Sequence, residues 1–119
     1  MKTILVVDDE PANAEVLSLI LEEEGYRVFV AANGRQGLER VAEVRPDLVI
    51  LDYMMPIMNG AAMGAALREN AQTRHIRILM NSSLTEGAVR SHFDGYDAFL
   101  RKPYSVDAAL QVIAGLLAR

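Results

Sequence analysis

The stretch LVILDYMMPIMNG at residues 48–60 decides the fold, because an apolar run there ends directly in a carboxylate. Residues 48–51 are all apolar, which is typical of a strand buried on both faces of a parallel sheet. Asp52 follows at once, and a buried carboxylate without a partner is costly or takes up a proton. We therefore expect other parts of the chain to bring positive charge to Asp52.

Similar apolar runs recur along the chain and alternate with helical patterns. We expect strands over residues 3–7, 27–31, 48–51, 78–80 and 98–100. The spacing of apolar residues between them predicts helices over 12–24, from Asn33 up to Pro46, over 61–70, over 86–93, and through 116 after a cap at Ser105. Because the strands lack in–out alternation, the sequence predicts an α/β fold, a doubly wound five-stranded parallel sheet with five helices.

Length and composition limit the classes of protein to consider. The 119 residues suit one domain, and we expect a single domain over residues 1–119 with no output domain. The chain has no Cys, which excludes disulfides and thiolate metal sites. The net charge of −4 disfavours nonspecific binding to nucleic acids or anionic membranes, and no apolar run reaches the ~20 residues of a membrane span. We expect a cytoplasmic protein that contacts neither nucleic acid nor membrane.

Polar residues end four of the five expected strands. Asp8 and Asp9 follow the first strand, Asp52 the third, Ser82 the fourth and Lys102 the fifth. In doubly wound sheets the ligand crevice lies outside the carboxyl ends of the strands, so these side chains converge on one edge. Repulsion among three neighbouring carboxylates raises the pKa of at least one of them unless a cation lies between them. A set of ligands made only of oxygen atoms favours Mg²⁺. Mg²⁺ and the Lys102 ammonium together balance Asp52.

A carboxylate beside Mg²⁺ and an ammonium has the parts of a phosphoryl acceptor. The two cations neutralise the transferring oxygens while the carboxylate of Asp52 attacks phosphorus and becomes an acyl phosphate. The Ser82 hydroxyl is placed to bond another phosphoryl oxygen. Backbone N–H groups after the third and fourth strands are candidates for the remaining contacts.

These residues resemble the receiver domain of two-component response regulators, over essentially the whole chain. The matching motifs are ILVVDDE at 4–10, DLVILDYMMPIMNG at 47–60, the pair Ser82 and Ser83, and FLRKPYS at 99–105. The resemblance implies a flavodoxin-like fold with strand order 2-1-3-4-5. It also implies that Asp52 is the phosphoacceptor.

The resemblance implies a metal site built from four residues. Asp9 and Asp52 match direct Mg²⁺ ligands, and Asp8 matches a residue that acts mainly through a metal-bound water. The backbone carbonyl of Met54 completes the protein ligands.

Further roles follow for the phosphoryl group and for the response to it. Lys102 matches the lysine that grips the phosphoryl group, and its peptide bond to Pro103 is expected to be cis. Ser82 and Phe99 match the two switch residues, and Ser83 offers a backbone N–H.

The switch position at the fourth strand has more than one alignment. Counting without gaps places Asn81 or Met80 there instead of Ser82. We prefer Ser82, because residues 78–80 form the strand core and Ser83 is a small successor.

The resemblance favours a phosphorylation-controlled signalling switch. A sensor histidine kinase or a histidine phosphotransfer protein donates a phosphoryl group to Asp52. The face formed by the expected helix over 86–93, the strand over 98–100 and the last helix then changes its affinity for a downstream protein target. The chain catalyses only its own aspartyl phosphorylation and dephosphorylation. A stand-alone regulator, a phosphorelay shuttle and a phosphorylation-dependent homodimer all remain open.

Three alternatives lead to different chemistry. A non-catalytic receiver piece of a larger regulator, used only for docking or dimerisation, would be expected to lack one of the acids or the lysine, and all are present. A Mg²⁺ phosphatase with an aspartyl nucleophile, of the haloacid dehalogenase type, needs Asp-x-Asp after the first strand, whereas Asp8 and Asp9 are adjacent. A flavodoxin-like cofactor binder needs a phosphate loop rich in Ser, Thr and Gly, and the acids 8–10 would repel a phosphate.

Overall fold

Five strands form one parallel sheet in the order β2-β1-β3-β4-β5 in the computed structural model, which describes residues 1–118. The strands are β1 (Thr3–Val7), β2 (Arg27–Ala31), β3 (Leu48–Asp52), β4 (Arg77–Ser82) and β5 (Ala98–Arg101). The helices are α1 (Pro11–Glu23), α2 (Gly34–Val44), α3 (Gly60–Glu69), α4 (Glu86–Arg90) and α5 (Val106–Leu117). The predicted fold class and strand order are confirmed.

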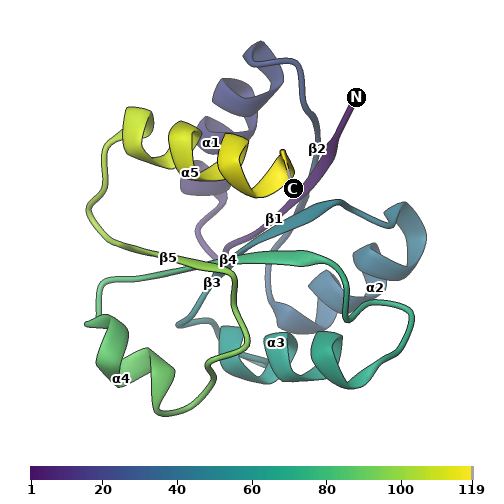
Figure 1. The fold of residues 1–119 in the computed structure, drawn as a ribbon, viewed down its shortest axis with the longest axis vertical. Coiled ribbons are helices and arrows are strands. Elements are labelled where there is room, and N and C mark those ends of the chain that lie inside the picture. The colour runs from purple at the N-terminus through teal and green to yellow at the C-terminus, as the bar shows by residue number, and fades with distance from the viewer. Residues whose placement is uncertain (119) are drawn as a thin grey trace.

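The helices divide into two layers, one on each face of the sheet (Figure 1). Helices α1 and α5 pack on one face, where Leu21 and Ile113 meet Ile4, Ile50 and other strand residues. Helices α2, α3 and α4 cover the opposite face, where their side chains pack against residues such as Leu5 and Leu51. All five residues of β3 are buried, because β3 is central and covered on both sides. This explains its uninterrupted apolar run.

Polar side chains cap several helices at the carboxyl edge of the sheet. Asn33 Oδ1 accepts a hydrogen bond from Gln36 N at 2.9 Å at the start of α2. Asn59 caps α3 in the same way, and Ser105 caps α5, as the sequence predicted. Each cap satisfies a backbone N–H that the helix itself leaves without a partner.

Helix α4 ends at Arg90, three residues before the predicted end at Phe93. Two side chains in the following turn compete for the helix backbone: Ser91 Oγ donates to Ala88 O at 2.8 Å, and His92 Nδ1 lies 3.1 Å from the same oxygen. The Phe93 ring then packs tightly against the backbone of α3 and of the α4–β5 connection at two glycines. The chain turns after Arg90, and this turn places the Phe93 ring against Gly64 and Gly95.

Arg68 joins three segments at the end of the sheet opposite to the carboxyl edge. Its guanidinium bonds Asp97 Oδ2 at 3.0 Å and the carbonyl oxygens of Gly95, Arg74 and Ile76 at 2.7–2.8 Å. The arginine therefore fixes the α3–β4 and α4–β5 connections to the C-terminal end of α3.

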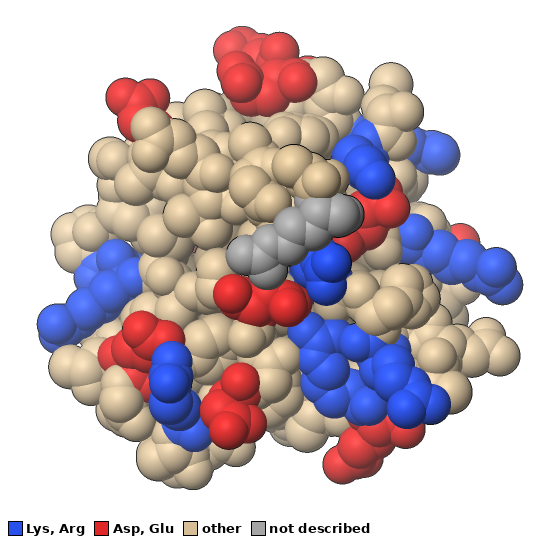
Figure 2. Space-filling model, in the orientation of Figure 1, with Lys and Arg blue, Asp and Glu red and all other residues tan. Residues whose placement is uncertain are grey.

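The surface carries both signs of charge. On the face in Figure 2, basic and acidic side chains lie interspersed among uncharged ones. Within residues 1–118, no helix combines the length and the apolar character required to cross a bilayer.

Candidate functional site

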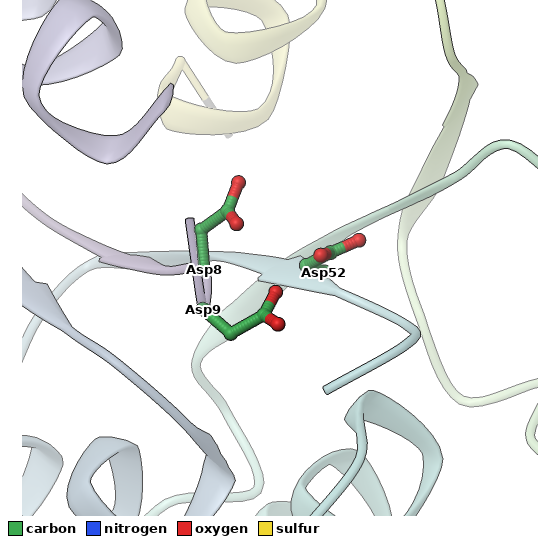
Figure 3. A group of neighbouring side chains, drawn as sticks. All are labelled: Asp8, Asp9 and Asp52. Carbon is green, nitrogen blue, oxygen red and sulfur yellow. The ribbon is translucent and has the colours of Figure 1, made fainter. Parts of the chain in front are cut away.

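Three carboxylates gather at the carboxyl ends of β1 and β3 (Figure 3). Asp8 and Asp9 follow β1 directly, and Asp52 is the last residue of β3. Each residue offers one carboxylate oxygen, and these three oxygens all lie within 4.8 Å of one another. Asp52 is buried, with 6% of its surface exposed, whereas Asp9 is open to solvent. The carboxylate of Asp52 therefore lies in the protein interior, and that of Asp9 lies in contact with water.

The topology of the sheet brings these residues together. β1 has β2 on one side and β3 on the other, and the helices that follow β1 and β3 pack on opposite faces. Such a reversal leaves a crevice above the two strand ends. Local bonds then orient the chain: Asp8 N donates to Ala31 O at 3.0 Å, and Asp8 Oδ1 accepts from Glu10 N at 2.9 Å.

Lys102 supplies the positive charge that the sequence led us to expect beside Asp52. Its Nζ donates to Asp52 Oδ1 at 3.2 Å and lies 3.9 Å from Asp8 Oδ2. The backbone N–H of Lys102 bonds Ser82 O at 2.8 Å, so the ends of β4 and β5 are joined beside the site. The peptide bond between Lys102 and Pro103 is cis.

The electrostatics of the site leave the negative charge incompletely balanced. Burial raises the pKa of Asp52 to about 6, the Lys102 ammonium opposes this shift, and the charges of Asp8 and Asp9 add to it. Burial by itself lowers the pKa of Lys102, but the Asp52 carboxylate and, to a smaller extent, that of Asp8 together outweigh this effect and raise the pKa of Lys102 above its ordinary value. Lys102 thus stays cationic at neutral pH. Its single ammonium does not cancel the rise in the pKa of Asp52 that burial and the two neighbouring carboxylates cause.

The donor set fits a hard divalent cation. Three carboxylates of graded exposure provide oxygen ligands of high charge density, without nitrogen or sulfur, and Mg²⁺ accepts a few such ligands together with waters. A cation there would also supply the positive charge that Lys102 alone does not.

A glycine makes room beside the buried carboxylate. A Cβ on Gly60, the first residue of α3, would lie 2.5 Å from the backbone oxygen of Asp52. The N–H of Gly60 bonds Tyr53 O at 2.8 Å. The start of α3 therefore touches the backbone of the phosphoacceptor candidate, and no side chain fits between them.

Ser82 and Asn81 lie side by side at the end of β4 but face opposite layers. Asn81 is the register partner of Asp52 and lies one residue before Ser82. Both are buried, at 4% and 1% exposure. Because side chains alternate along a strand, Ser82 lies on the same side as Met80, towards α2 and α3, and its Oγ accepts from Leu84 N at 3.0 Å.

The remaining predicted residues surround this edge. Met54 lies in the β3–α3 loop with 60% of its surface exposed, and Ser83 is exposed directly after β4. Phe99 pairs with Met80 in the sheet, and its ring centroid lies 5.9 Å from that of Tyr96. In the same β3–α3 loop, Ile57 adopts a φ of 69°, which is unusual for a β-branched residue.

A family model of the response regulator receiver domain matches residues 4–114. The chain belongs to this family. The DNA-binding dual master transcriptional regulator RpaA of Synechocystis is 34% identical to this receiver domain over 123 residues, which cover all of this chain and 50% of RpaA. The DNA-binding response regulator MtrA of Mycolicibacterium smegmatis is 39% identical over 101 residues, which cover 85% of this chain and 44% of MtrA. The receiver domain thus spans about half the length of these curated relatives.

Solved receiver domains superpose over nearly the whole chain. The signal receiver domain of a histidine kinase from Syntrophus aciditrophicus has a TM-score of 0.92 at 35% identity and covers 99% of this chain and 91% of its own. The chemotaxis protein CheY4 of Vibrio cholerae has a TM-score of 0.91 at 30% identity, with 98% of each chain covered. The response regulator TrrA of Thermotoga maritima, solved in complex with Mg²⁺ and BeF, has a TM-score of 0.88 at 31% identity and covers 98% of this chain and 99% of its own.

The structure brings four of the predicted side chains into one cluster, namely Asp8, Asp9, Asp52 and Lys102. Ser82 and Phe99 lie on β4 and β5, towards α2 and α3. Sequence reasoning considered Asn81 only as an alternative to Ser82 and did not place it beside Asp52. The available signal was an amide at the end of an otherwise apolar strand.

Proposed function

We propose that this receiver domain is a phosphorylation-controlled signalling switch and that Asp52 is its phosphoacceptor. The observation that supports this most directly is the contact of the Lys102 ammonium with the buried carboxylate of Asp52 at 3.2 Å, beside the two acids that follow β1. A carboxylate needed only for structure would be more stable exposed, or paired without two like charges nearby.

The transfer is a displacement at phosphorus. A carboxylate oxygen of Asp52 attacks the phosphorus of a phosphohistidine, the P–N bond breaks, and its electron pair returns to the imidazole of the donor. Lys102 neutralises one of the transferring oxygens, and the Ser82 hydroxyl and the Ser83 N–H donate to others. Mg²⁺, when bound, supplies the remaining positive charge at those oxygens.

Four groups would hold the metal. Asp9 and Asp52 provide direct carboxylate ligands, and the backbone carbonyl of Met54 provides a third. Asp8, whose carboxylate is fixed by the N–H of Glu10, acts mainly through a metal-bound water.

The response passes from the site to the face formed by α4, β5 and α5. The phosphoryl group adds charge at Asp52 and draws the Ser82 hydroxyl towards it. Because Lys102 N bonds Ser82 O, this movement also affects β5, which carries Phe99. A change in Phe99 displaces the adjoining Tyr96, whose hydroxyl donates to Glu86 of α4 at 2.8 Å. The affinity for a downstream protein target changes as a result.

The partners follow from this chemistry. The phosphoryl donor is a sensor histidine kinase or a histidine phosphotransfer protein, which places the protein in the cytoplasm. The chain acts as a stand-alone regulator or phosphorelay shuttle, or as the receiver part of a longer regulator. The role as the receiver part of a longer regulator is supported by relatives that are about twice as long as this chain. Phosphorylation-dependent homodimerisation through the same face is a third element of the proposal.

Incubation with Mg²⁺ and acetyl phosphate tests the assignment. We expect the protein to gain the mass of one phosphoryl group and Asp52→Ala to gain none. Asp47→Ala is the matched control, since Asp47 lies just before the other end of β3 and accepts a hydrogen bond from Thr3 N, and it should be modified like the unchanged protein. Modification of Asp52→Ala at the same rate would overturn the assignment.

A further inference from the structure

The side chain of Asn81 is an unusual feature beside the site. The residue is 4% exposed, and within residues 1–118 its amide oxygen is shielded and has no hydrogen-bond partner. A buried polar atom without a partner destabilises a fold, so an apolar residue would suit this position better. The amide therefore calls for an explanation outside stability.

Asn81 lies on the same face of the sheet as Asp52 and Lys102. It faces the layer of α1 and α5, because side chains alternate and Leu79 packs in that layer. In the sheet register Asn81 is directly beside Asp52 on β3 and beside Leu100 on β5. Lys102 follows Leu100 by two residues and so lies on the same face.

A cleft of about 410 Å³ joins Asn81 to Lys102. Both residues line it, together with Asp8, Tyr104 and apolar side chains of α1. An ordered water needs space and two to four polar partners, and the amide, the ammonium and the carboxylate of Asp8 provide them. The amide oxygen is the shielded atom and the amide nitrogen is not, so the N–H side of the amide is the one that can reach a water in the cleft.

We propose that Asn81 is a positioning residue for Lys102, acting through one water in this cleft. The water accepts one hydrogen bond from the Lys102 ammonium and another from the Asn81 amide N–H, and it donates to the Asp8 carboxylate that lines the same cleft. The ammonium then has an anchor besides Asp52, and it remains over the phosphoacceptor when Asp52 carries a phosphoryl group. This inference rests on the proposed function, because it concerns the same lysine.

A matched pair of substitutions separates hydrogen bonding from shape. Asn81→Val and Asn81→Thr have nearly the same volume and both suit a strand, but Thr keeps a hydroxyl. The measurements are the affinity for beryllofluoride in the presence of Mg²⁺, the affinity for Mg²⁺ alone, and thermal unfolding.

We expect Asn81→Val to bind beryllofluoride roughly threefold to tenfold more weakly, the range that one hydrogen bond gives. Its affinity for Mg²⁺ should stay unchanged and its unfolding temperature should rise. Asn81→Thr should restore most of the affinity for beryllofluoride. An affinity of Asn81→Val equal to that of the unchanged protein, or equal losses in the Val and Thr variants, would overturn the proposal.

A second measurement does not depend on phosphorylation chemistry. The change in unfolding temperature caused by Asn81→Val is measured without metal, in the unchanged protein and in Lys102→Met. A water shared by the two side chains makes the changes non-additive, whereas strictly additive changes refute the coupling. If the unchanged protein failed to bind beryllofluoride, the proposed function would fail, and this cycle would still decide the role of Asn81.

Discussion

Replacing Asp52 by Asn should change how the stability of the protein depends on pH. The pKa of Asp52 is raised from its ordinary value of 3.8 to about 6 in the folded protein. The folded state therefore holds this proton more tightly than the unfolded chain, and the free energy of unfolding falls as pH rises through this window. The difference between a pKa of 3.8 and a pKa of about 6 corresponds to about 3 kcal/mol. Asn carries no titrating proton, so the variant should lose this pH dependence.

Urea unfolding with EDTA present, at several pH values from about 4 to about 7.5, provides the assay. The quantity to follow is the stability of Asp52→Asn minus that of the unchanged protein, because most other titrating groups cancel in this difference. The difference should grow by about 2.4 kcal/mol between about pH 4 and about pH 7.5, because the unfolded carboxyl is already more than half ionised at the lower limit. Its absolute value also contains the lost contact of Lys102 with Asp52, so the slope is the cleaner measure.

Mg²⁺ should restore the stability that the unchanged protein loses at neutral pH, and it should have much less effect on Asp52→Asn. Added at neutral pH, the metal should stabilise the unchanged protein, because it binds the folded state, and should stabilise Asp52→Asn much less. A stability difference that stays constant with pH would refute the idea that Asp52 is held ionised at a cost. A difference that shrinks as pH rises would refute it more strongly, since the sign would be opposite.

Three further predictions concern stability and are checked by chemical denaturation. Gly60→Ala should lose about 2 kcal/mol or more, because its Cβ would collide with backbone, whereas Gly87→Ala should gain about 0.5 kcal/mol, since the described part of the chain leaves its Cβ free; equal effects would contradict this. Arg68→Ala should cost about 2–3 kcal/mol by leaving its carboxylate and carbonyl partners unpaired, and the exposed Arg74→Ala should cost little. Ile57→Asn should gain about 1 kcal/mol because Asn tolerates a positive φ, and a loss would refute strain at that position.

The sequence predicted the sheet well because its signal is local. Five apolar runs and the residues that end them can be read directly, and the structure keeps Asp8, Asp9, Asp52 and Lys102 at one edge. The strand order is different, since it came from the resemblance to a family and not from periodicity. Pattern alone predicts parallel strands, but many orders satisfy the same pattern.

Two features escaped the sequence because they depend on distant contacts. Helix α4 ends early, since Phe93 has to pack against two glycines that lie far apart in the chain. The position of Asn81 beside Asp52 depends on the register of β3 with β4, in which a shift of one residue would exchange the faces of Asn81 and Ser82. Neither contact leaves a periodic trace in the sequence.

The brevity of α4 has a consequence for signalling. With five residues and Val89 as its buried anchor, this segment can loosen while the central strands keep their hydrogen bonds. Its attachment to the Tyr96 hydroxyl is a polar contact near the surface and breaks at small energetic cost. In the proposed switch, a change that reaches Tyr96 can therefore alter this short helix while the central strands that align the site keep their hydrogen bonds.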